Sequence, residues 1–152
     1  MRATVTLLAL IAALLLAACG GDGDSIGDGP QATLTDDGCT YEGDQTPTDG
    51  SFTIVVENRT DFFGAFALAR LTNQTIDELK PQLKKAQQQF KRSGAIPPPP
   101  DYYKQIVRTG VEAGKTGALP ADVPKGTYVL TCFVDDLPTW RVYAAAQIFV
   151  DE

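Results

Sequence analysis

Short strand-like runs separated by turn residues dominate the sequence from residue 31 to its end. They lie at 31–36, 51–58, 64–70, 103–109, 126–134 and 145–150, and the runs at 51–58 and 126–134 are the clearest. Runs of this length, bounded by Gly, Pro, Asn and Asp, are typical of the strands of a small β-sandwich. We therefore predict one mainly β domain over residues 31–152.

Residues 75–94 depart from this strand pattern and predict an amphipathic helix. Thr75 and Glu78 match the N-cap and N3 positions of a capping box. Apolar residues then recur on one helical face at positions 76, 79, 83, 86 and 90. Pro81 lacks a backbone donor, so we expect a kink there, or a short turn followed by a second helix that begins at Pro81. The helix is expected to end near Ser93 and Gly94, before a stiff proline run at 97–100.

The first 18 residues have the pattern of a signal peptide. A basic Arg2 precedes a run that is apolar from residue 5 to residue 18 except for Thr6. This run is shorter than the roughly 20 residues that a membrane-spanning helix needs. It ends in the letters LAAC at residues 16–19, which resemble the lipobox of bacterial lipoproteins. An ordinary signal peptide with an incidental cysteine is the alternative interpretation.

The lipobox resemblance implies that Cys19 carries a diacylglyceryl group and further acyl chains such as palmitate. Two or three chains anchor a protein stably, whereas one holds it only marginally. The protein would then be extracytoplasmic, on the outer face of the cytoplasmic membrane or on the outer membrane of a bacterium. Residues 19–30, rich in Gly and Asp, are predicted to form a flexible tether between the anchor and the domain.

Two cysteines remain if Cys19 is lipidated, namely Cys39 and Cys132. An even pair outside the cytoplasm normally forms a disulfide, which we predict here. The closed loop is long, and its chain entropy corresponds to about 4–5 kcal/mol of stabilisation before strain. A redox-active or metal-binding thiol pair is the alternative, but the chain has neither a C-x-x-C motif nor a histidine to activate a thiolate.

The chain contains no histidine, which excludes Ser-His-Asp triads, Cys-His pairs and His-based zinc or copper sites. Carboxylate pairs occur at 36–37 and 135–136. Neighbouring residues of a strand point to opposite faces, so neither pair is arranged for acid–base chemistry. We therefore expect that the protein is not an enzyme.

Charge is unevenly distributed along a chain whose net charge is -6. Residues 20–61 hold ten acidic groups and one basic group, whereas residues 70–108 hold eight basic and three acidic groups. The basic helix is suited to anionic lipid headgroups or to an acidic protein partner, or it is simply a solvated face. An acidic, lipid-anchored chain is not expected to bind nucleic acid.

The C-terminal half resembles the end of a cupredoxin-like domain. The resemblance rests on the run LPADVPKGTYVLTCFV at 119–134 and on FTIVVENRT at 52–60, which resembles the family's strand ending in an Asn-rich turn. It implies a cupredoxin-like Greek-key β-sandwich with the helix as an insertion. Cupredoxins with blue copper use two His, a Cys and a weak axial Met or Gln.

The resemblance also indicates what stands in place of those copper ligands. The first histidine slot falls near Phe62 or Phe63 and the second near residues 141–143, while Cys132 takes the thiolate slot and Gln147 lies near the axial one. We therefore predict no blue-copper site, no metal and no cofactor.

Aromatic residues are expected to gather where the copper site would have been, at one end of the sandwich. These are Phe62, Phe63, Trp140 and Tyr143. They would form either a small apolar ligand pocket or a plug that completes the core. The function expected is a non-enzymatic binding or interaction module of the cell envelope, with an envelope protein or a small ligand as partner. The alternative is an accessory lipoprotein that delivers iron or copper through carboxylates or thiols.

Overall fold

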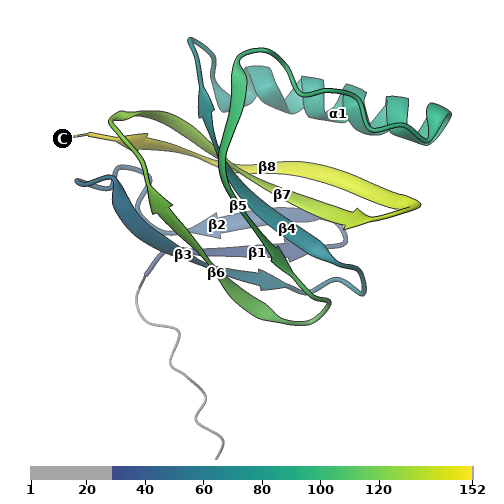
Figure 1. Cartoon of the computed structure of the whole chain (residues 1–152), viewed down its shortest axis with the longest axis horizontal. Helices are drawn as coiled ribbons and strands as arrows, with labels where there is room; N and C mark the ends of the chain where they lie inside the picture. Colours follow the sequence, from purple (N-terminus) through teal and green to yellow (C-terminus); the bar gives the residue numbers. More distant parts are fainter. Residues whose placement is uncertain (1–28, 152) are drawn as a thin grey trace, which may run out of the picture.

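A computed structural model describes residues 29–151 and places them in two four-stranded sheets with one helix (Figure 1). The predicted signal peptide, Cys19 and all but the last two residues of the predicted tether lie outside the described residues. Within residues 29–151, no helix is long and apolar enough to cross a membrane.

The two sheets form a sandwich. The first sheet has the order β2 (Gly38–Glu42), β1 (Gln31–Thr35), β3 (Ser51–Asn58) and β6 (Thr116–Asp122). The second has the order β5 (Tyr103–Val111), β4 (Gly64–Leu71), β7 (Gly126–Asp136) and β8 (Thr139–Val150). Strands β1 and β3 are parallel, and every other pair is antiparallel.

The chain passes between the sheets after β3, after β5 and after β6. This connectivity is the predicted cupredoxin-like Greek-key β-sandwich with one inserted helix, and the prediction of fold class is confirmed. Strands β2 and β6 were not among the predicted runs.

The main core lies between the two sheets and follows from the alternation of each strand. Ile54 and Val56 of β3 face Tyr128, Leu130 and Val134 of β7 across this interface, and all five are fully buried. Each such side chain stabilises the fold by about 1.5–3 kcal/mol relative to an exposed one.

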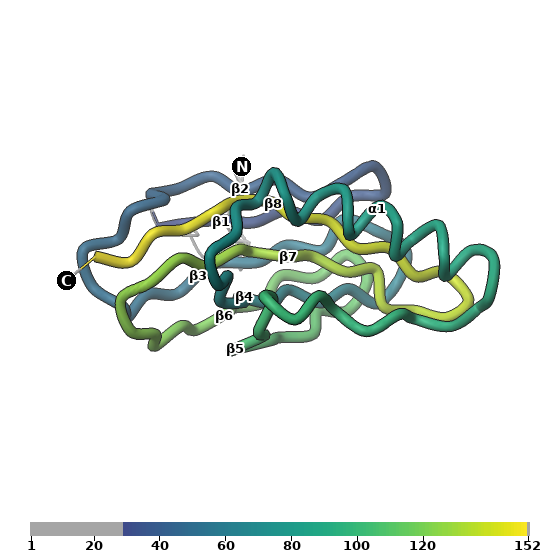
Figure 2. The backbone as a smooth tube through the Cα atoms, turned by 90° about the horizontal axis from the view of Figure 1, so that it is seen from above, coloured from purple at the N-terminus to yellow at the C-terminus, as the bar shows by residue number. Residues whose placement is uncertain are grey.

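The second sheet is buried on both of its faces. Every residue of β4 except Arg70 is buried, because helix α1 (Ile76–Ser93) packs against the face that points away from the first sheet. Leu71 packs there against Leu79 of the helix. Near the other end of α1, Phe90 packs on Trp140, so the helix extends over the β7–β8 end of the sheet (Figure 2).

Helix α1 begins and ends where the sequence predicts. The Glu78 carboxylate accepts hydrogen bonds from the Thr75 backbone N–H, at 2.7 Å, and from its hydroxyl, at 2.9 Å. At the other end, Gly94 adopts a left-handed φ of 70° and donates to the Phe90 carbonyl. Pro81 lies inside one continuous helix, so the predicted second helix beginning at Pro81 does not form. The capped first turn and the buried Leu79 hold the turn before Pro81 in helical conformation.

Candidate functional site

The four aromatic residues predicted to share one end of the sandwich lie in three different places. Phe62 and Tyr143 pack against the core between the sheets. The Phe63 ring lies over Gly110, where an added Cβ would meet its Cζ at 2.4 Å, and the side chain is 42% exposed. Trp140 lies on the outer face of the second sheet, beneath α1.

The prediction of a single pocket formed by these four residues is therefore wrong. Positions 140 and 143 are three residues apart on one strand, and an odd spacing places two side chains on opposite faces. Phe62 and Tyr143 instead match the alternative interpretation, in which aromatic side chains complete the core.

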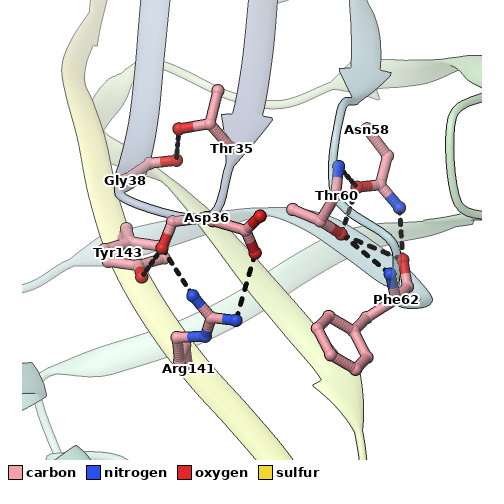
Figure 3. Close-up of polar contacts among 8 residues, drawn as sticks. All are labelled: Thr35, Asp36, Gly38, Asn58, Thr60, Phe62, Arg141 and Tyr143. Carbon is pink, nitrogen blue, oxygen red and sulfur yellow. Dashed lines mark hydrogen bonds and ion pairs between the residues drawn. The ribbon is translucent and has the colours of Figure 1, made fainter.

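The end of the sandwich that carries the predicted histidine slots is closed by polar contacts around Asp36 (Figure 3). The Arg141 guanidinium donates to the Asp36 carbonyl and, at 3.2 Å, to its carboxylate. The Tyr143 hydroxyl donates to the same carbonyl at 3.2 Å. The guanidinium also lies 5.9 Å from the centre of the Phe62 ring, at cation–π distance. Side chains at both predicted histidine slots thus contact one another.

A buried asparagine organises the turn beside this group (Figure 3). The Asn58 amide donates to the carbonyls of Phe62, at 2.8 Å, and Val111, at 3.0 Å. Its oxygen accepts from the backbone N–H and the hydroxyl of Thr60. Gly64 is needed here because an added Cβ would lie 2.8 Å from the Asn58 nitrogen.

The predicted disulfide between Cys39 and Cys132 is present, with the two Cα atoms 6.2 Å apart. It joins β2 of the first sheet to β7 of the second. Both sulfurs are committed to this bond, so neither acts as a thiolate ligand while it is intact. In the part of the chain that the structure describes, no three side chains of His, Cys, Asp or Glu are grouped so as to hold a metal ion.

A cavity of about 490 Å³ lies on the outer face of the second sheet, at a place the sequence did not predict. Its floor is formed by Phe133, Trp140 and Val142. Leu83 and Ala86 of α1 form one wall, and the proline run at 97–100 forms another. Pockets that hold small molecules have this size and a mostly apolar lining.

The helix is held over this cavity by contacts with strand β8. The Gln87 amide donates to the Val142 carbonyl at 2.7 Å, and the centres of the Phe90 and Trp140 rings lie 5.4 Å apart. After the helix, the proline run leads back into β5, where the Tyr103 N–H donates to the Pro100 carbonyl. A polyproline segment is stiff, so this wall keeps its shape without regular hydrogen bonds of its own.

The two charged residues among those lining the cavity, Lys85 and Arg108, are both cations. The Arg108 guanidinium lies 4.9 Å above the Phe133 ring and pairs with Asp135. The amides of Gln82, Gln89 and Gln105 also line the cavity. The whole chain has a net charge of -6, so the cavity is a basic region of an acidic protein.

Tyr103 lies at the boundary between the cavity and the buried part of the sheet. Its hydroxyl is 2.8 Å from the Thr131 hydroxyl, which itself donates to the Ala67 carbonyl. Tyr103 is therefore the donor of the first bond. Burial raises the pKa of the Tyr103 phenol above its ordinary value, so it remains a neutral donor at physiological pH.

A second hollow, of about 720 Å³, lies beside the first turn of α1 and is more open. It is lined mainly by the turn at 71–75 and by polar side chains such as Arg70 and Lys104. The N–H groups of Thr75 and Ile76 are already bonded to Glu78 and Gln147, so they are not free to bind a ligand. The smaller, better-walled cavity is the candidate site.

Comparison with known proteins finds similarity to two solved structures. No protein-family model and no curated protein match the sequence. The sodium-dithionite-reduced auracyanin of the photosynthetic bacterium Roseiflexus castenholzii is 16% identical, with a TM-score of 0.39 over 76% of this chain and 94% of that one. Auracyanin B is 12% identical, with a TM-score of 0.36 over 76% of this chain and 86% of that one. Similarity this weak says nothing about the ligand or activity of this chain.

Proposed function

We propose that this protein is a non-enzymatic ligand-binding module of a bacterial cell envelope, anchored through a lipidated Cys19. The observation that carries the proposal is the cavity of about 490 Å³ between α1, the proline run and the second sheet. Its lining supplies apolar surface, amide groups and cations, which are the components of a binding site.

The position of the cavity suits an anchored receptor. The first described strand, β1, belongs to the first sheet, and α1 lies on the far side of the second sheet (Figure 1). The cavity is lined by α1, the proline run and the outer face of the second sheet. A chain attached to a membrane through its N-terminal tether can therefore present the cavity on the side away from its point of attachment.

Binding can be tested with Nile red, a neutral apolar dye whose emission rises in a dry pocket. The chain has one tryptophan, Trp140, and it lies in the cavity floor, so its fluorescence reports occupancy. We expect saturable Nile red binding with quenching of Trp140. Ala86→Phe should fill the cavity and weaken binding, whereas Gln88→Phe, on an exposed part of the same helix, should not. Thermal unfolding checks that both variants fold, and saturable binding unchanged by Ala86→Phe would contradict the proposal.

The anchor is tested separately by fractionating bacterial cells. Cys19→Ala should move the protein from the membrane to the soluble extracytoplasmic fraction. Gly23→Ala, which leaves the lipobox intact, should stay with the membrane. A Cys19→Ala protein that remains membrane-bound would refute the anchor without bearing on the cavity.

A further inference from the structure

We propose that the ligand of this cavity is an amphiphilic carboxylate, with its apolar tail on the cavity floor and its anionic head between Lys85 and Arg108. This inference rests on the proposed binding function and names the class of ligand. The apolar part of the lining indicates the tail of the ligand, and the cationic part indicates its head.

The floor and walls suit an apolar tail. Trp140 is 7% exposed and Val142 3% exposed, so both lie deep beneath the opening. The helical residues of the lining extend from Gln82 to Gln89, which is about 10 Å along the helix axis. Ile96, 48% exposed, lines the opening and adds apolar surface that a bound tail would cover.

The charges at the opening suit an anionic head. Lys85 makes no ion pair within residues 29–151, so its ammonium is available. Asp135 pairs with one terminal nitrogen of Arg108, and a guanidinium has five N–H donors, so further donors remain for a ligand. No carboxylate is among the lining residues.

The charges on the chain around the cavity also favour an anionic head group. From residue 79 to residue 100 the chain has five basic residues and no acidic one. Their summed field raises the local concentration of anions and disfavours ammonium ligands. A neutral ligand would gain from the apolar floor but would leave Lys85 without a partner.

The test measures the binding of three ten-carbon compounds to the full chain by Trp140 fluorescence and calorimetry. The two ionic compounds are used below their micelle concentrations and the alcohol below its solubility limit. Decanoate, decan-1-ol and decylammonium have the same tail and differ in the charge of the head. We expect decanoate to bind roughly tenfold or more tightly than decan-1-ol, because hydrogen bonds to charged groups contribute most to selectivity. Decylammonium should bind most weakly.

Two neighbouring lysines provide matched variants. Lys85→Gln should weaken decanoate binding roughly tenfold and leave decan-1-ol binding unchanged, because it removes the charge at the opening. Lys84→Gln removes the same charge from the next position of α1, outside the lining, and should change neither by more than about twofold after screening by salt.

The outcomes separate the ligand class from the binding function. Equal affinity for all three compounds, or a preference for decylammonium, would overturn the anionic head while leaving the cavity a binding site. Equal losses in Lys84→Gln and Lys85→Gln would also overturn it, because the head would then lie outside the cavity. If neither Nile red nor any decyl compound binds, the proposed function itself fails.

Discussion

At the scale of single residues, Asn58 shows how one buried side chain can fix a turn. Its amide makes four hydrogen bonds, two as donor and two as acceptor, which is its full ordinary capacity. The sequence predicted a turn at residues 58–61, which include the turn-prone residues Asn58, Thr60 and Asp61. It did not indicate that the same side chain would reach Val111, which is 53 residues away.

Asn58→Ala should lower the free energy of unfolding by about 2–4 kcal/mol, because buried carbonyls and N–H groups lose their partners. Urea denaturation measures this loss. Gln88→Ala, at an exposed helical position, should change stability by less than about 0.5 kcal/mol. A small effect of Asn58→Ala would mean that water replaces the missing amide.

Asn58→Asp adds a pH dependence to this prediction. The new carboxyl group would face the carbonyl oxygens of Phe62 and Val111, so burial and repulsion would raise its pKa in the folded state. The folded protein would then hold the proton more strongly than the unfolded chain, and the variant should lose stability as pH rises from 4 to 7. A destabilisation that is the same at both pH values would contradict this account.

Because Tyr103 is buried, we expect the folded protein to lose stability under alkaline conditions. Burial raises the pKa of its phenol, so the folded state keeps the proton that the unfolded chain begins to lose near its ordinary pKa of 10.0. Its contribution is therefore complete below that pH and declines as pH rises above it. Tyr103→Phe should cost about 1 kcal/mol at pH 7 for the lost hydrogen bond and should flatten the alkaline decline.

Urea titrations between pH 7 and 11 test the Tyr103 prediction. The pKa values of Tyr41, Tyr102 and Tyr128 are also raised by burial, so the decline should become shallower but not disappear. An unchanged slope in Tyr103→Phe would assign the alkaline loss to the other tyrosines.

At the scale of elements, a β-bulge in strand β8 allows residues on both sides of the bulge to contact helix α1. Ala144 pairs with Thr131 and Ala146 with Leu130, which leaves Ala145 as an extra residue. Before the bulge, Trp140 and Val142 point toward α1, and after it Gln147 does. Strict alternation would place the Gln147 side chain on the interior face, together with that of Tyr143. The three consecutive alanines at 144–146 carry no sequence signal for the bulge.

Gln147 completes the N-terminus of α1 from a position 71 residues away, since its side-chain oxygen accepts the Ile76 N–H at 2.8 Å. Gln147→Ala should lower stability by about 1 kcal/mol, as the loss of a helix cap does. Hydrogen exchange at Ile76 should become faster, whereas Gln105→Ala, at an exposed strand position, should leave it unchanged. Unaltered exchange at Ile76 in Gln147→Ala would show that Glu78 alone caps the helix.

The elements themselves were largely readable from the sequence, and the exceptions have physical causes. Runs of strand-forming residues bounded by turn residues predicted β3 and β7, and the capping box predicted the start of α1. Strand β2 begins with Gly38, and β6 contains Gly117 and Pro120, residues that weaken the strand pattern. These strands form because their neighbours β1 and β3 provide the pairing.

At the scale of the whole molecule, the disulfide adds a covalent bond between two sheets that also meet through side-chain packing and through hydrogen bonds such as that from Asn58 to Val111. Two cysteines left over in a compartment predicted to be oxidising were enough to predict it. The cavity could not be predicted in the same way, because it depends on where α1 and the proline run lie over the β7–β8 end of the sheet. That placement comes from contacts such as the one between Gln87 and Val142, which join residues far apart in the chain.

Removing the disulfide should cost about 4–5 kcal/mol, since it closes a loop between residues separated by 93 positions. Cys39→Ala together with Cys132→Ala, compared with the oxidised wild type in urea, measures this cost. The cavity left by Cys132, which is fully buried, adds to the loss. A reductant should destabilise the wild type and leave the double variant unaffected, and equal stability of all forms would contradict the prediction.

The same disulfide also determines how the domain would respond to a pulling force. Tension applied between its two ends would pass from β1 across the Cys39–Cys132 bond and leave through β7 and β8. The long segment between the cysteines, which includes α1 and the cavity wall, would carry no load. Strand β1 lies beside the parallel strand β3, so it would be sheared rather than unzipped. A protein pulled in this way would keep α1 and the proline wall of the cavity within the unloaded covalent loop, whereas the cavity floor of Phe133, Trp140 and Val142 lies in the strands that bear the load.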